Sequence, residues 1–147
     1  MRIFVACMCA LLVATAAAMP VAARACEVPP LAGAWENPHA SETQDVTRLE
    51  IAHACQTHLT GGRAALSGTT WTVRAFSKCA PRDCKWGREA ASTDDEGNLV
   101  VVFATFSARR TLHIRHAGHA VYLDVDVDYH DARTADRVQN LVLVAAD

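Results

Sequence analysis

The sequence lacks a basic excess, internal repeats and low-complexity tracts. Its 147 residues include 14 Lys or Arg and 16 Asp or Glu. Two of the basic residues, Arg2 and Arg24, belong to a predicted export signal, so 12 basic residues face 16 acidic ones in the remaining chain, a net charge of −4. Phosphate backbones and anionic lipids both need a basic surface. We therefore expect no nucleic-acid partner and no docking on anionic membranes.

Patterns of catalysis and metal binding are also missing. Ser, His and Asp are present, but there is no Gly-x-Ser-x-Gly elbow, and the cysteines after the export signal have no Cys-x2-Cys spacing of a zinc site. His113, His116 and His119 are the alternative metal ligands, yet a spacing of three places His113 and His116 on opposite faces of a strand. We predict a protein that is not an enzyme, with no catalytic residues, no metal and no cofactor.

The N-terminus predicts export. Met1-Arg2, an apolar run from Ile3 to Ala18 and the small-x-small site Ala23-Arg24-Ala25 are typical of a secretory signal peptide over residues 1–25. The run is too short and too rich in Ala for a membrane-spanning helix. We expect a periplasmic or secreted protein with no integral membrane segment after cleavage and a single domain over residues 26–147. The alternatives are a retained N-terminal anchor and a lipid on Cys26.

Four cysteines remain after cleavage, and in an exported protein they predict disulfides. Cys79 and Cys84 enclose four residues with Pro and Asp, and this short loop brings their Cα atoms within bridging range. Cys26–Cys55 follows by elimination. We thus expect one disulfide at a hairpin turn and one near the N-terminus.

Short β-branched and apolar runs recur about every ten residues, between turn signals. This spacing predicts an all-β fold, an antiparallel up-and-down barrel of about eight strands. The candidate strands are Ala34–Glu36, Val46–His53, Thr70–Lys78, Trp86–Ser92, Leu99–Phe106, Arg110–His116, Val121–Tyr129 and Val138–Val144.

Residues 41–59 fit two structures. Ser41-x-x-Gln44 resembles a capping box and Gly61 a helix end, but the strand pattern gives the more apolar face and is favoured. The clearest pairing lies later in the chain, where a turn at Gly118-His119 sets Ile114 against Leu123 and Leu112 against Val125, with His113 opposite Asp124 and Thr111 opposite Asp126.

Two strands are apolar on both faces. Val100, Val102 and Phe106 share one face of their strand, and Val142 and Val144 lie on the last strand. We expect these residues to form one outer patch, and a symmetric homodimer would cover it. The competing explanation is that the chain ends or the segment at Pro29-Pro30 lie across it.

Two resemblances support the barrel. Leu31-Ala32-Gly33-Ala34-Trp35 resembles the Gly-x-Trp opening of calycin barrels, the lipocalin and avidin group, in which the Trp plugs one barrel end. The segments at 46–51 and 78–87, with the motif Lys-Cys-x-Pro-x-Asp-Cys-x-Trp-Gly, are similar to a secreted bacterial domain family over most of residues 33–130. The resemblance implies a calycin-like fold and no catalytic residues, and the biotin-contacting residues of the avidin group have no match.

The three tryptophan side chains suggest a ligand-binding site. Trp35, Trp71 and Trp86, with Arg74, are candidates to line a ligand pocket in a barrel mouth, and core packing is the alternative for the rings. The first functional hypothesis is a binding module for a small apolar or amphipathic molecule. The second is a protein-interaction module, such as a secreted protease inhibitor or an envelope assembly factor. A wide, lined interior favours the first, and a filled interior with an exposed apolar patch favours the second.

Overall fold

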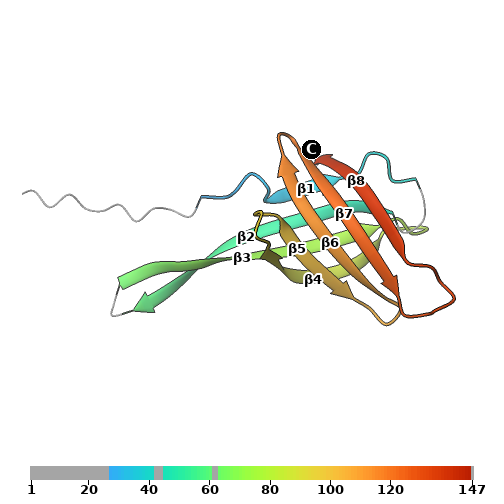
Figure 1. Cartoon of the computed structure of the whole chain (residues 1–147). Helices are drawn as coiled ribbons and strands as arrows, with labels where there is room; N and C mark the ends of the chain where they lie inside the picture. The colour runs from blue at the N-terminus through green and yellow to red at the C-terminus, as the bar shows by residue number, and fades with distance from the viewer. Residues whose placement is uncertain (1–26, 42–44, 61–62, 147) are drawn as a thin grey trace, which may run out of the picture.

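The chain folds into a closed barrel of eight antiparallel strands. The computed structural model describes residues 27–41, 45–60 and 63–146. Each strand pairs with its neighbour in sequence, and the last strand pairs with the first. The predicted all-β, up-and-down barrel is therefore confirmed, and it is compatible with a calycin-like fold. The strands are β1 (Gly33–Glu36), β2 (Val46–Thr60), β3 (Arg63–Ser77), β4 (Cys84–Thr93), β5 (Leu99–Ala104), β6 (Ala108–Ala117), β7 (Ala120–Tyr129) and β8 (Arg137–Ala145), shown in Figure 1.

The β6–β7 hairpin has the register that the sequence predicts. Ile114 pairs with Leu123 and Leu112 with Val125, and all four side chains are buried. The polar pairs His113–Asp124 and Thr111–Asp126 follow from the same register. Gly118 forms the turn with a φ of 63°, a conformation that favours glycine. Because side chains alternate along a strand, this register places one face of the hairpin in the core and the other outside.

Residues 46–60 form a strand, which settles the choice between helix and strand for the part of 41–59 that the structure describes. Leu49 lies opposite Ala75 and Ile51 opposite Val73, so the apolar alternation of β2 meets that of β3 inside the barrel. Both strands are longer than predicted, and they leave the barrel as a two-stranded ribbon (Figure 1). Of the predicted capping box, Ser41 is described and is not helical, whereas Gln44 lies outside the described residues, as does the turn at 61–62.

Apolar side chains fill the interior of the barrel. Trp35 is 5% exposed, and its Nε1 donates a hydrogen bond to the carbonyl oxygen of Leu31 at 2.9 Å. Burying one large aliphatic side chain stabilises a fold by about 1.5–3 kcal/mol, so this cluster is the main source of stability. Its largest fully buried members are Phe103, Leu49, Leu99, Leu112, Ile114, Leu123, Leu143, Val46, Val73, Val101, Val121 and Val125.

The predicted single outer patch is wrong. β6 and β7 lie between β5 and β8, so the apolar residues of β5 and β8 are on separate parts of the wall. Val142 and Val144 are 46% and 44% exposed, and Val142 lies opposite the exposed Tyr122. Phe106 follows β5 and is fully exposed. The homodimer stays a prediction, but the continuous surface on which it was based is not there.

The Cys79–Cys84 disulfide is confirmed, with the two Cα atoms 5.5 Å apart across the β3–β4 turn. Cys55 is also disulfide-bonded, and its predicted partner Cys26 lies outside the described residues, as does the predicted signal peptide. Among the residues described, no helix has the length and apolar character to cross a membrane.

The two faces of β7 give a direct test of the register. We expect Leu123→Ala to lower the free energy of unfolding by about 3 kcal/mol, because it leaves a cavity in the filled interior. Asp124→Ala, one residue along on the outer face, should change it by less than about 0.5 kcal/mol. Urea denaturation measures both, and equal losses for the two variants would contradict the register.

Candidate functional site

The four predicted site residues do not line one pocket. Trp35 stands edge-on to the ring of His116 at 5.5 Å, and Trp71 contacts His53 at 4.4 Å between ring centroids. Arg74 lies across the sheet from Glu50 and reaches its carboxylate at 3.4 Å, with more than a third of its side chain exposed.

Trp86 has a third set of neighbours. Its ring packs against Phe103 at 5.7 Å, and its Nε1 donates a hydrogen bond to Ser77 Oγ at 2.8 Å. The three tryptophans thus pack against separate parts of the core, and Arg74 lies on the outer surface. Core packing, the alternative weighed for these rings, describes them better than a shared ligand pocket.

A β-bulge turns Trp86 inward. Ala75 pairs with Gly87 and Phe76 with Lys85, so Trp86 has no partner on β3. Gly87 has a φ of 105°, which residues with a side chain rarely adopt. The extra residue changes the alternation of β4, because a bulge lets two residues oppose one. As a result Trp86 packs in the core, while its neighbour Lys85 stays outside.

Four connections meet at one end of the barrel, which we call the disulfide end. Their described residues are 37–41 with 45, 78–83, 105–107 and 130–136. Asp45 joins its own connection to the start of β8, because its carboxylate accepts hydrogen bonds from the Ser41 amide at 3.2 Å and from Nη2 of Arg137, the first residue of β8, at 2.7 Å. Its carbonyl accepts a hydrogen bond from the Lys78 amide at 2.8 Å, and Lys78 Nζ caps the carbonyl of Ser41 at 3.0 Å. This partly buried network links the β1–β2 connection to the start of the β3–β4 connection and to the start of β8.

A groove of about 520 Å³ lies on the outer surface beside this end. Five residues on five adjacent strands form one cross-strand row along it, since each lies opposite the next. They are Val144, Glu36, Arg48, Phe76 and Lys85. The remaining lining residues are Asn37, Pro38, Thr47, Arg82 and Asp83. We call these ten residues the outer groove.

Phe76 and Arg48 form the floor of the outer groove. Phe76 is 6% exposed, and the guanidinium of Arg48 lies over its ring at 4.5 Å from the centroid. Arg48 also forms an ion pair with Glu50. Thr47 Oγ1 donates a hydrogen bond to Asp83 Oδ2 at 2.6 Å, which ties β2 to the disulfide loop. The floor is therefore aromatic and cationic, on a rigid support.

The charges of the outer groove are unevenly distributed. Arg48 and Arg74 share the carboxylate of Glu50. By contrast, no hydrogen bond or ion pair within the described part of the chain holds the exposed side chains of Arg82 and Lys85. The β4 side of the groove is thus basic and the β1 side, at Glu36, is acidic. Unpaired cations in a hollow attract anionic groups more than cations on an open surface do.

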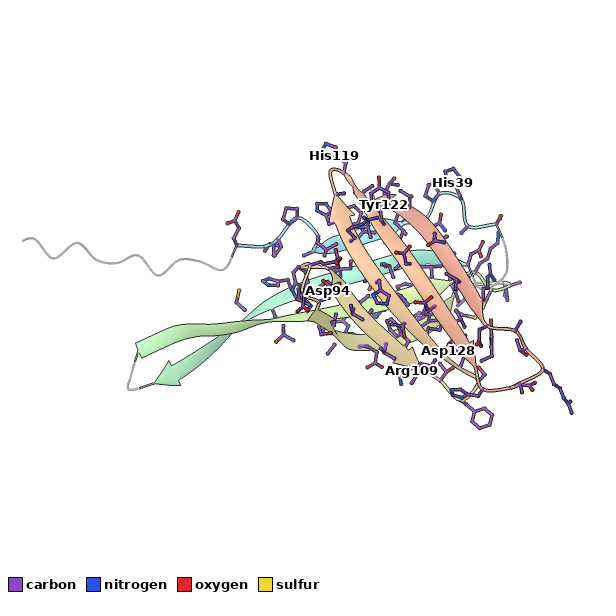
Figure 2. All side chains as sticks on the ribbon, in the orientation of Figure 1. His39, Asp94, Arg109, His119, Tyr122 and Asp128 are labelled. Carbon is purple, nitrogen blue, oxygen red and sulfur yellow. A yellow bond between two sulfur atoms is a disulfide. The ribbon has the colours of Figure 1, made fainter. Side chains whose placement is uncertain are left out.

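The three histidines that were candidate metal ligands point to different places. His113 approaches Asp126 at 3.9 Å on the outer face, and His116 contacts Trp35. His119 lies at the tip of the β6–β7 turn, far from the paired Arg109 and Asp128 near the other end of the hairpin (Figure 2). Among the described residues, no group of three or more His, Cys, Asp or Glu side chains is placed to hold a metal ion.

A second hollow of about 250 Å³ lies near the β4–β5 turn, lined by Asp94, Glu96, Asn98, His113, Arg115 and Asp124. Asn98 donates hydrogen bonds to the Asp94 carboxylate from its side chain at 3.1 Å and from its amide at 2.8 Å. The Asn98 side-chain bond is the largest cause that lowers the pKa of Asp94 below its ordinary value. Two of the three carboxylates that line this hollow, those of Asp94 and Glu96, are therefore already hydrogen-bonded within the turn.

Comparison of this chain with protein-family models, curated proteins and solved structures finds no match. The outer groove therefore stands on its geometry alone. Sequence reasoning missed Arg48, Phe76 and Lys85, because only the pairing of five strands brings them together. The one signal in the sequence was the Trp-Gly step after the second cysteine, which produces the bulge.

Removal of the Asn98 side chain tests the turn network. We expect Asn98→Ala to raise the pKa of Asp94 towards its ordinary value, because the largest stabilising bond to the carboxylate is lost. Since the pKa is lowered in the folded state, the bond stabilises the fold above the unfolded-state pKa and the contribution is lost as the pH falls through the folded-state value. NMR titration of the Asp94 side chain measures this, and an unchanged pKa would contradict it.

Proposed function

We propose that the protein is an exported protein-interaction module, a calycin-like barrel that binds a segment of another protein in the outer groove. Export is supported by the signal-like N-terminus and by the disulfide, which needs an oxidising compartment to persist. The site is the outer surface at the disulfide end, and the interior serves as the rigid support.

The observation that carries this proposal is the filled interior. A pocket for a small ligand is concave and has about 300–1,000 Å³. The barrel axis is instead occupied by buried side chains such as Phe103 and Leu112, and the tryptophans pack into or against the same cluster. An apolar ligand would have to displace them. The outer groove, of about 520 Å³, lies outside this cluster.

The composition of the outer groove suits a protein partner. Arginine and aromatic residues are enriched where binding energy concentrates, and a polar rim surrounds them. Phe76 with Arg48 over it is such a centre, and Arg82, Lys85 and Glu36 form a charged rim. The rim charges would steer and orient a partner of complementary charge.

Site-specific photo-crosslinking in the native cells tests the proposal. A benzoylphenylalanine in place of Lys85 should yield an adduct of defined mass with one polypeptide, because Lys85 borders the groove. The matched control replaces Asn140, an exposed residue on the outer face of β8. The same adducts at both positions, or none at position 85, would contradict the groove.

A second measurement separates the proposal from a ligand carrier. Native mass spectrometry of protein purified from its own cells should show the mass of the polypeptide alone. A stoichiometric small molecule that is retained by the wild type and lost on Leu112→Trp, which would overfill the interior, would overturn the proposal.

A further inference from the structure

The closed barrel is joined between β4 and β5 over only a part of the two strands. Only three residue pairs join these strands, namely Ala91–Val101, Ser92–Val100 and Thr93–Leu99. β5 pairs with β6 along all of its 6 residues, and β4 pairs with β3 up to its first residue. Residues 88–90 of β4 and 102–104 of β5 therefore face each other without a sheet ladder, and residues 85–87 face the β5–β6 connection at 105–107. We call this opening the slit.

Glu89 shows that the slit is open to solvent. It lies directly opposite Val73, which is fully buried, and opposite residues share one face of a sheet. Glu89 therefore belongs to the inner face of the wall, yet it is exposed. An inner-face residue becomes exposed only where the neighbouring strand does not cover it. The backbone edge of β4 next to Glu89 is accordingly accessible from outside.

Aromatic side chains cover the core behind the slit. Trp86 stands edge-on to Phe103, and the guanidinium of Arg110 lies over Trp86 at 4.8 Å from the ring centroid. A hollow of about 240 Å³ lies between the start of β4 and the β5–β6 connection, with Trp86 and Arg110 in its lining. A segment in the slit would therefore rest on this layer without entering the interior.

From this geometry we propose that an extended, acidic segment of a partner protein pairs with the free edge of β4 as an added strand. The proposal rests on the proposed function and names the partner's chemistry. An exposed strand edge is a template for main-chain hydrogen bonds, and the side chains beside it select the sequence.

Charge selects an acidic segment. Lys85 and Arg88 are exposed on the outer face of β4, and Arg88 has no ion pair within the described residues. Arg110 adds a third cation at the end of the slit. Acidic side chains on the outward face of the added strand would lie opposite Arg88 and beside Lys85, and such cross-strand pairs are stabilising.

The same charges disfavour a second copy of this chain as the occupant. Antiparallel pairing of two β4 edges would bring Lys85 and Arg88 of one copy against those of the other. Like charges opposite each other destabilise a sheet, and cations on an edge are a common defence against self-association. A foreign acidic strand meets no such repulsion.

NMR titration of the full mature chain tests the proposal. The probe is a ten-residue peptide in which Glu alternates with Val, blocked at both termini. We expect shifts of the amide signals confined to residues 85–90 and 102–104, and new protection of those amides from exchange. A Lys–Val peptide of equal length should bind about tenfold more weakly, since two to three charge pairs change sign.

Two controls keep the result specific. Methylation of every second peptide nitrogen should abolish binding if main-chain pairing carries it, and equal binding of the methylated peptide would overturn added-strand pairing. Arg88→Glu should reverse the preference between the two peptides, while Arg133→Glu, an equal charge change on the exposed β7–β8 loop, should not.

Shifts spread over other strands, or no binding, would overturn the inference. If a crosslink forms at position 85 but no peptide binds, the added-strand proposal is contradicted and the groove proposal stands. If the peptide binds but no crosslink forms, the groove proposal is contradicted.

Discussion

Closure of the sheet through β1 is the constraint on which the rest of the structure depends. β1 has only 4 residues, yet it pairs with β2 on one side and with β8 on the other. Trp35 makes this short strand sufficient, because its ring is buried in the core while its indole nitrogen is anchored to the Leu31 carbonyl. The Ala146 amide donates a further hydrogen bond to Ala34 beside it, at 3.0 Å. Without this closure the seven other strands would form an open sheet with two free edges.

The filled interior is the reason why we propose a binding site on the outside of the barrel. A barrel of eight strands is just wide enough for its own side chains to fill it, and here large apolar residues do so. The bulge at Trp86 contributes one more ring to the core, and the same bulge leaves Lys85 on the rim of the outer groove. The stability of the core and the chemistry of the surface are therefore coupled through one irregularity in β4. The added-strand proposal extends this idea to the edge of the same strand.

The sequence predicts regular features well and irregular ones poorly. The strict alternation of β7 determined both its faces and its register with β6, because a shift of one residue would expose Leu123 and Val125 and bury aspartates. The spacing of Cys79 and Cys84 determined the disulfide for a similar reason, since a short loop leaves few ways to pair. These features depend on neighbours in sequence.

The outer groove and the slit depend on where strands stop pairing, and periodicity carries no signal for that. Val100, Val102, Val142 and Val144 were grouped from their apolar faces, but strand order around the barrel separates them. Arg74 was grouped with the tryptophans as a residue of a barrel-mouth pocket, although alternation along β3 places it outside. Which side chains share a surface is set by the order of the strands around the closed barrel, and neighbours in sequence do not determine that order.

Hydrogen exchange of the backbone amides in the free protein tests the open wall most directly. Amides in a complete sheet exchange only when the structure opens, whereas amides on a free edge exchange nearly as fast as solvated ones. We predict that every second amide from Lys85 to Ala90 exchanges rapidly, while Ala91, Ser92 and Thr93 show the protection of paired strands. Protection of residues 85–90 as strong as that of β7 would show a closed wall and contradict the slit.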